Sequence, residues 1–310
     1  MTETHLLSTG NRPSIAGLDS VGVMNIGAAA DATWRDAVAR CPKKMDHGPC
    51  GGVQADGRCE VPGLGRCPFL AALEAWPYPD PPTPAGRSAR PVSAPQTSAP
   101  QASAPQASAR SAAAAAFLAA AAVRPVIVAD LPAAAMSADS LRACGAQLAP
   151  VADACLIGDH GGARVQFPPS YRARLLTDAG MSVWAGVNCR DRNRVAIEGE
   201  IAACVDAGVT GLHCVTGDHP ALGHRADAAG VFDLDCIDVV GLARNRGALV
   251  SVAHAPAAPP VSRRTSRLLA KADAGAEVVF VDHCGGPAAV GDAVAELRAA
   301  GFGGLVLGCV

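Results

Sequence analysis

The sequence predicts an α/β protein built on a TIM-type (β/α) barrel, and three observations support that fold class. Seven short segments rich in Val, Ile and Leu alternate with helix-like segments over the second part of the chain, as expected for parallel strands joined by helices. Polar residues follow most of these apolar segments directly, where an α/β barrel builds its active site. Neither a G-x-G-x-x-G loop after the first strand nor a P-loop motif is present, so a barrel is favoured over a dinucleotide-binding or P-loop fold.

Length and composition leave room for one large domain and one small one in 310 residues. Half of the residues are hydrophobic, the net charge is −2 and aromatic residues make up 4%. A nucleic-acid-binding protein usually shows a clustered basic face or aromatic stacking platforms. The composition therefore favours a protein with a sizeable core and no nucleic-acid partner.

The first segment, residues 1–26, is predicted to be a flexible tail. It has no basic stretch followed by an apolar run, so no secretory signal is expected. The longest apolar stretch, at 111–123, is alanine-rich and shorter than the roughly 20 residues that span a bilayer. We therefore expect a helix there, no membrane partner and a cytoplasmic location.

Residues 27–77 form a predicted cysteine-rich module that begins with a helix at about 27–40. Its four cysteines are separated by eight, eight and seven residues, and glycines between them allow tight turns. Thiolates select zinc or an iron–sulfur cluster, and the spacing does not decide between these two. The alternative is a set of buried thiols without a metal. The predicted ligands are Cys41, Cys50, Cys59 and Cys67.

A linker is predicted at 78–112, where the composition changes to Pro, Ala, Ser and Gln. A five-residue repeat beginning at Pro95 reads PQTSA-PQASA-PQASA. Such a tract has too little apolar surface to offset the entropy of ordering it, so we expect a disordered spacer between two domains.

Residues 113–310 are predicted to form the barrel. Seven strands are expected, whereas a closed barrel of this kind needs about eight. The barrel is therefore expected to be incomplete at its C-terminus, either because the chain is truncated or because another segment or subunit covers the open edge. The expected strands are 125–130, 152–159, 181–188, 210–218, 248–255, 276–283 and 303–310.

Two sets of motifs resemble the methylenetetrahydrofolate reductase family. The order Cys-Pro-Lys, HGPCGG, GRCEV and a fourth cysteine over about 35–75 looks like the cysteine-rich module that accompanies these reductases. The barrel part resembles their catalytic domain. Its matching stretches are NCRDRNR at 188–194, VTGDHPALG at 215–223, VFDLDCID at 231–238 and LLAKADAGAEVVFVDH at 268–283.

The resemblance implies an enzyme that reduces 5,10-methylenetetrahydrofolate to 5-methyltetrahydrofolate through FAD, with NAD(P)H as reductant, in one-carbon and methionine metabolism. The flavin would carry the hydride, and the protein would orient it and the folate. Because the substrate ring must open to an iminium ion before it accepts hydride, a proton donor is also implied.

The same resemblance assigns roles to individual residues. Asp130 takes the place of the family's glutamate acid, and Asp218 matches an aspartate beside flavin and folate, so both are candidate catalytic residues. Thr216, Gly217, Asp218 and Lys271 are candidate flavin-binding residues, and Asp282 stands where the family reads the pterin with glutamine. Arg267, one helical turn before Lys271, is a further flavin-binding candidate, although the family has a different residue there.

Two other functions stay open at this point. The chain could be a metal- or cluster-bearing partner subunit of a reductase or methyltransferase, or an inactive paralogue, since aspartates replace the family's residues at 130 and 282. A partner subunit or a homo-oligomer is a further expectation, besides the folate substrate.

Overall fold

The computed structural model describes residues 28–78, 110–159, 163–282 and 285–309. The predicted tail at 1–26 and nearly all of the predicted linker at 78–112 lie outside the described residues, so both stay predictions.

The centre of the fold is a curled sheet of seven parallel strands in the order of the sequence, β1-β2-β3-β4-β5-β6-β7. Each of the seven predicted strands is confirmed, although each is shorter than its apolar segment. The strands are β1 (Val128–Asp130), β2 (Ala154–Ile157), β3 (Val183–Asn188), β4 (Gly211–Val215), β5 (Val250–His254), β6 (Val278–Val281) and β7 (Leu305–Gly308).

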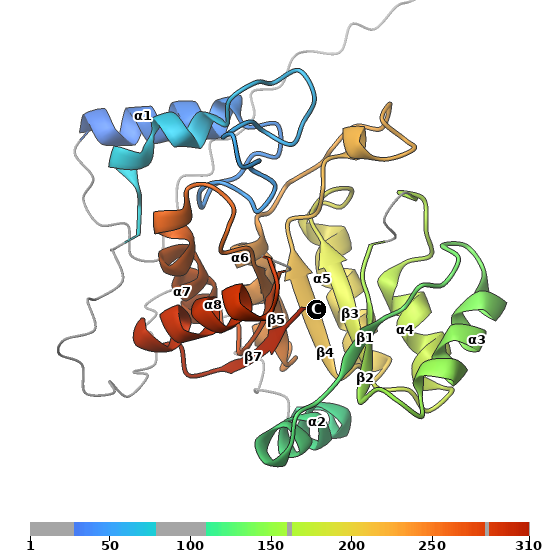
Figure 1. The fold of residues 1–310 in the computed structure, drawn as a ribbon. Coiled ribbons are helices and arrows are strands. Elements are labelled where there is room, and N and C mark those ends of the chain that lie inside the picture. Colours follow the sequence, from blue (N-terminus) through green and yellow to red (C-terminus); the bar gives the residue numbers. More distant parts are fainter. Residues whose placement is uncertain (1–27, 79–109, 160–162, 283–284, 310) are drawn as a thin grey trace, which may run out of the picture.

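Helices connect the strands on the outside of the sheet, as the strand–helix alternation predicts (Figure 1). Several begin at a polar cap: the Ser137, Asn193 and Asp235 side chains accept hydrogen bonds from the first turns of α3, α5 and α6. The helices are α3 (Ala138–Leu148), α4 (Pro169–Thr177), α5 (Arg194–Asp206), α6 (Cys236–Asn245), α7 (Arg264–Ala274) and α8 (Pro287–Ala299).

Side chains alternate across the sheet, and this alternation separates two cores. Outward-facing residues such as Val187, Leu212 and Val252 are fully buried beneath the helices in one large apolar cluster. Inward-facing residues such as Trp184 and Phe280 form a second cluster inside the curl. Since successive strand residues point to opposite faces, the near-continuous apolar runs of the sequence supply both cores.

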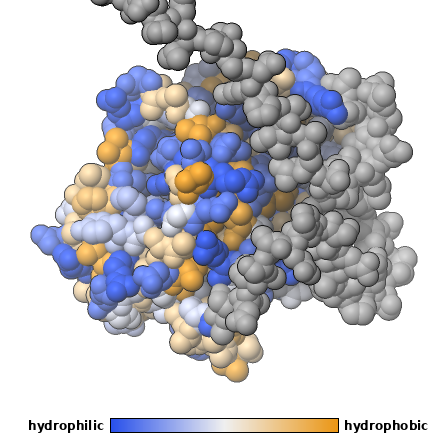
Figure 2. Space-filling model, turned by 180° about the vertical axis from the view of Figure 1, so that it is seen from behind, coloured by the Kyte–Doolittle hydropathy of each residue, from blue (hydrophilic) through white to orange (hydrophobic). Residues whose placement is uncertain are grey.

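The alanine-rich segment forms the helix α2 (Ala112–Val123), which closes the amino-terminal end of the curl from below (Figure 1). Its Ala114 and Phe117 are buried, and the Phe117 ring meets the Trp184 ring edge-on with centroids 5.6 Å apart. The opposite face of α2 is exposed, with Val123 83% accessible. Apolar colour at the lower end of Figure 2 coincides with this helix.

The described part of the cysteine-rich segment, residues 28–78 (hereafter the cysteine segment), has a small apolar cluster of its own. It holds α1 (Ala28–Arg40) and two short 3₁₀ helices, Pro68–Ala71 and Leu73–Ala75. Trp34, Phe69 and Trp76 pack around one another, with ring centroids 5.0 Å and 5.9 Å from Trp34. Figure 1 shows this segment over the carboxyl ends of the strands, at the end opposite α2.

The sheet has two edges in the described part of the chain, because β1 pairs with β2 alone and β7 with β6 alone. The observed architecture is therefore a curled half-barrel that resembles a TIM-type barrel without an eighth paired strand. Among the described residues, no helix is both long and apolar enough to cross a membrane.

Gly211 tests how tightly the inner core is packed. A Cβ atom there would lie 2.3 Å from the Trp184 ring, whereas a Cβ atom on Gly199, in the middle of α5, would meet nothing within 4 Å. We expect Gly211→Ala to lower the free energy of unfolding by about 1–3 kcal/mol, since a full core resists added volume. Gly199→Ala should raise it by about 0.5–1 kcal/mol, because glycine disfavours helix. Urea denaturation measures both, and equal effects would contradict the close packing described here.

Candidate functional site

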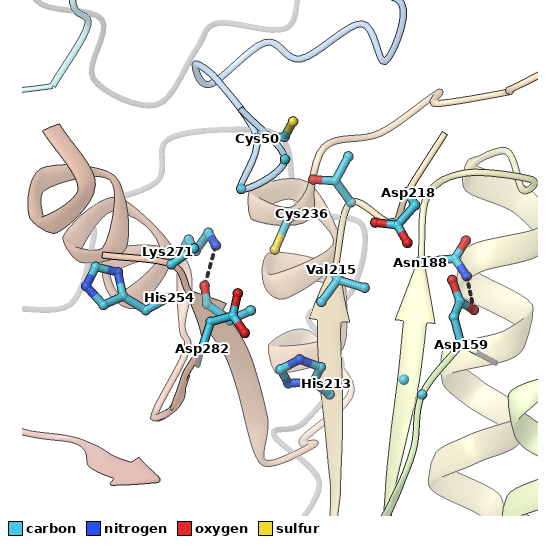
Figure 3. A pocket seen from close by; sticks show the side chains of 18 of the residues that line it. Cys50, Asp159, Asn188, His213, Val215, Asp218, Cys236, His254, Lys271 and Asp282 are labelled. Atoms are coloured by element: carbon cyan, nitrogen blue, oxygen red, sulfur yellow. Dashed lines mark hydrogen bonds between the residues drawn. The ribbon is translucent and has the colours of Figure 1, made fainter. Parts of the chain in front are cut away.

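A cavity of about 600 Å³ lies at the carboxyl ends of the strands, beneath the cysteine segment (Figure 3). The sheet supplies its floor and walls, and the cysteine segment supplies Lys43, Cys50 and Glu60 to its lining. Active sites of α/β barrels are built at this end of the strands, so the cavity is the candidate functional site.

One wall of the cavity is a saturated carboxylate network around Asp159, which follows β2. Its carboxylate oxygens accept hydrogen bonds from the Asn188 amide at 2.9 Å, the Gln166 amide at 2.7 Å and the Arg190 guanidinium at 2.6 Å. Figure 3 shows Asn188 and Asp159 pointing toward each other. With these partners Asp159 is a neutralised structural anchor for the ends of β2 and β3.

The loop after β4 carries Thr216, Gly217 and Asp218 along the same wall. Gly217 has φ +83°, and a Cβ atom there would lie 2.9 Å from the Asn188 Cβ, so the close approach of this loop to β3 requires glycine. Asp218 is 59% exposed and lies 3.4 Å from the buried guanidinium of Arg164. Its charge is therefore partly compensated at the cavity rim.

The opposite wall is cationic and comes from α7, which carries Arg264, Arg267 and Lys271. Arg264 donates only to carbonyl oxygens, among them those of Pro49 and Cys50 in the cysteine segment. Lys271 donates to the Ala253 carbonyl at 2.9 Å and forms no ion pair with any described residue. Burial, aided by the two arginines, lowers the pKa of Lys271.

Arg267 forms a buried ion pair with Asp235, the N-cap residue of α6. Its guanidinium lies 3.1 Å and 3.3 Å from the two carboxylate oxygens, and the two side chains are 6% and 0% exposed. Burial favours a neutral Asp235, but Arg267 and His47 outweigh burial and hold the pKa of Asp235 below its usual value. Arg267 also donates to the His47 carbonyl, so one side chain links α6, α7 and the cysteine segment.

The cysteine segment is attached to the sheet by further polar contacts around the cavity. Lys43 and Glu60 form an ion pair at 2.7 Å, both nearly buried, and the His219 amide also approaches Glu60. The Trp76 indole donates to the Ser266 hydroxyl of α7 at 3.1 Å. Although burial opposes its charge, Cys50 and Glu60 raise the pKa of Lys43, so its ammonium remains charged at the cavity.

The structure brings most of the predicted site residues together. Cys41, Cys59 and Cys67 do not line the cavity, and neither does Asp130, which is exposed at the end of the edge strand β1. The predicted catalytic pair of Asp130 and Asp218 therefore does not share this cavity. The predicted residues that line it are Cys50, Thr216, Gly217, Asp218, Arg267, Lys271 and Asp282.

Sequence reasoning missed several residues of the site. Lys43, Glu60 and Arg264 come from a distant segment or a helix face, and their sequence context gives no sign of a cavity. His213 lines the cavity from the middle of β4, and its position could have been found. It is the polar residue of an otherwise apolar strand and lies two residues before the inward-facing Val215.

Comparison with known proteins gives one partial family match. Residues 35–77 match the family model described as methylene-tetrahydrofolate reductase C terminal. This range covers the cysteine segment alone. No curated protein matches this chain.

Solved structures with a similar fold include 2,3-dimethylmalate lyase, a member of the PEP mutase/isocitrate lyase superfamily, at 17% identity and TM-score 0.46, covering 63% of this chain and 71% of that one. Phosphonopyruvate hydrolase matches at 12% identity and TM-score 0.43, covering 63% and 70%. Oxaloacetate acetylhydrolase matches at 13% identity and TM-score 0.41, covering 57% and 64%. These likenesses concern the fold.

These neighbours are lyases and hydrolases, which contradicts the predicted FAD-dependent reduction of 5,10-methylenetetrahydrofolate with NAD(P)H. The predicted FAD cofactor and the assignment to methionine metabolism are therefore wrong, whereas the choice of Thr216, Gly217, Asp218, Arg267 and Lys271 as site residues stays a prediction.

The predicted zinc or iron–sulfur centre is also contradicted. Among the described residues, no group of three or more Cys, His, Asp or Glu side chains is placed to hold a metal ion. Cys67 is buried in the apolar cluster of the cysteine segment, where burial and the neighbouring Cys50, Cys41 and Cys59 raise its pKa to about 11. The Cys59 sulfur accepts a hydrogen bond from the Val61 amide instead. The predicted partner subunit or homo-oligomer stays a prediction.

The buried ion pair of Arg267 and Asp235 leads to a prediction about stability. Arg267→Met leaves the Asp235 carboxylate buried and uncompensated, so we expect the free energy of unfolding to fall by about 3–5 kcal/mol. The double variant with Arg267→Met and Asp235→Asn should recover part of that loss, because it no longer contains the uncompensated carboxylate charge. Arg142→Met is the control, since the exposed Arg142–Asp139 pair contributes about 0–1 kcal/mol. Urea denaturation at pH 7 compares them, and equal losses for both arginines would refute the role of the pair.

The contact of His47 with Asp238 leads to a prediction about how stability depends on pH. Burial lowers its pKa, but Asp238, 3.8 Å away, and Asp235 outweigh burial and raise it above the ordinary value. A raised histidine pKa adds stability below the unfolded value of about 6.5, and that stability is lost as pH rises through the folded pKa. The urea midpoint should therefore fall more between pH 6 and pH 8 for the native protein than for His47→Gln. An identical pH dependence in the native protein and in His47→Gln would contradict the interaction of His47 with Asp238.

Proposed function

We propose that this chain is an enzyme that binds a small organic anion in the cavity at the carboxyl ends of its strands, and that Lys271 exchanges a proton with that anion. The observation that carries the proposal is the partly buried ammonium of Lys271, which lines the cavity and forms no ion pair with any described residue.

The charges of the two walls support an anionic ligand. The carboxylates Asp159 and Asp218 already lie against the guanidinium groups of Arg190 and Arg164. On the α7 wall Arg267 has a carboxylate partner, whereas Arg264 and Lys271 contact carbonyl oxygens among the described residues. Because a buried charge without a counter-ion is costly, an anion bound beside α7 would supply the missing negative charge.

The lowered pKa of Lys271 supports acid–base chemistry. A desolvated lysine holds a larger share of neutral amine near neutral pH than an exposed one, and can therefore take a proton from the ligand and return it. A perturbed pKa in a cleft is typical of catalytic groups, although ion-pair networks also cause it. Lys271 reaches the cavity from α7, and Figure 3 shows its amine directed toward the space above Asp282.

Binding of simple anions tests the first half of the proposal. Inorganic phosphate, succinate and oxaloacetate are titrated by calorimetry into the native protein, Lys271→Met and the surface control Arg142→Met. We expect at least one anion to bind the native protein and the control alike. Lys271→Met should weaken that binding by about 10- to 100-fold, the size of a lost charged hydrogen bond. Absence of binding by all three anions, or equal binding to Lys271→Met, would overturn it.

Proton transfer tests the second half. In deuterated water, a base that removes a proton next to a carbonyl group speeds deuterium incorporation into the methylene group of oxaloacetate, which nuclear magnetic resonance follows. The native protein should accelerate this exchange above the rate without protein, increasingly as pH rises toward the pKa of Lys271. Lys271→Met should show no acceleration. An unchanged rate in that variant would remove Lys271 from the chemistry.

A further inference from the structure

His213 is a buried polar residue of the cavity lining that the proposed chemistry leaves unused. It lies in the middle of β4 with its side chain inside the curl, 9% exposed, and forms part of the cavity lining. Its ring meets the Phe280 ring edge-on at 5.0 Å. Figure 3 shows the His213 ring at the floor, below Val215.

One ring nitrogen of His213 is fixed by the neighbouring strand. Nδ1 lies 2.9 Å from the hydroxyl oxygen of Ser251, which pairs with His213 across β4 and β5. The same hydroxyl donates to the Leu212 carbonyl at 3.4 Å. A serine hydroxyl has a single proton, so both contacts are made together only when Nδ1 carries the imidazole proton and Ser251 accepts it.

The other ring nitrogen is then an acceptor. With Nδ1 protonated, Nε2 holds a lone pair, and it has no hydrogen-bond partner among the described residues. Gly186 pairs with His213 on the other side, and Gly158 follows β2 beside it. These two residues bring no side chain into the space around the ring. Burial, aided by the charge of Lys271, lowers the pKa of His213 to about 4, so the imidazole is neutral at pH 7.

We propose that His213 accepts a hydrogen bond through Nε2 from a hydroxyl group of the ligand, and that Ser251 is the positioning residue that sets the required tautomer. The proposal rests on the proposed function and narrows its substrate class to hydroxy carboxylic acids. The carboxylate would lie against Lys271, and the hydroxyl group would reach the floor. A ligand without that donor would leave a buried acceptor unpaired, which is the strongest way a site rejects an analogue.

The tautomer is tested without any ligand. Long-range proton–nitrogen correlation spectra at pH 7 distinguish a protonated ring nitrogen from one with a lone pair, and His213→Phe assigns the signals. We expect protonated Nδ1 in the native protein. Ser251→Ala should shift the population toward protonated Nε2 while circular dichroism shows an unchanged fold. Protonated Nε2 in the native protein would overturn this inference and leave the anion site of Lys271 standing.

Selectivity is tested with malate and succinate, which differ by one hydroxyl group. The native protein should bind malate about 10- to 100-fold more tightly. His213→Phe and Ser251→Ala should bring the ratio toward one, mainly through weaker malate binding. Lys271→Met should weaken the binding of both malate and succinate and leave the ratio of their affinities unchanged. Equal affinities in the native protein would overturn the hydroxyl contact alone, whereas failure of both acids to bind would overturn the anion site and this inference with it.

Discussion

The buried ion pair of Arg267 and Asp235 is the contact on which the rest of the site depends. Asp235 caps α6, Arg267 stands on α7, and the same guanidinium reaches the His47 carbonyl of the cysteine segment. Two opposite charges that are both buried must stay together, because separating them leaves an uncompensated charge in a low-dielectric interior. The pair therefore holds two helices and the covering segment in one arrangement above the strand ends. The cavity forms because, in that arrangement, the cysteine segment covers Lys271 and the carboxyl ends of the strands.

The parallel sheet explains why the cavity is polar while its surroundings are not. Most outward side chains of the central strands β2 to β6 are apolar and buried under helices. Inside the curl, the end near α2 is filled by Trp184, Phe280 and Phe117. Above these rings the inward positions change to small or polar residues, including Gly186, His213 and Ser251. Close packing below and small residues above confine the empty space to one end of the curl.

Motif resemblance and tertiary structure lead to different conclusions about function. The cysteine motifs agree with the family model matched at residues 35–77, yet among the described residues no group of three or more Cys, His, Asp or Glu side chains is placed to hold a metal ion. A motif records which residue types occur in which order, whereas a metal centre needs sulfur atoms that converge on one point. In the same way, Asp130 occupies a strand end as predicted but belongs to the edge strand, away from the cavity. Matching residues at matching spacings thus located the site without defining its chemistry.

The sequence by itself determined the seven strands, the helices between them, the alanine-rich helix and the end of the sheet at which polar residues gather. These features follow from local periodicity and from short breaks at glycine and polar caps, which act within a few residues. Only the tertiary structure decided that residues 28–78 cover the strand ends, that Arg267 pairs with Asp235 rather than with a ligand, and that Ser251 orients His213. Those contacts join positions that are far apart in the sequence, and their geometry depends on the curl of the sheet and the packing of whole elements. No local pattern encodes that geometry.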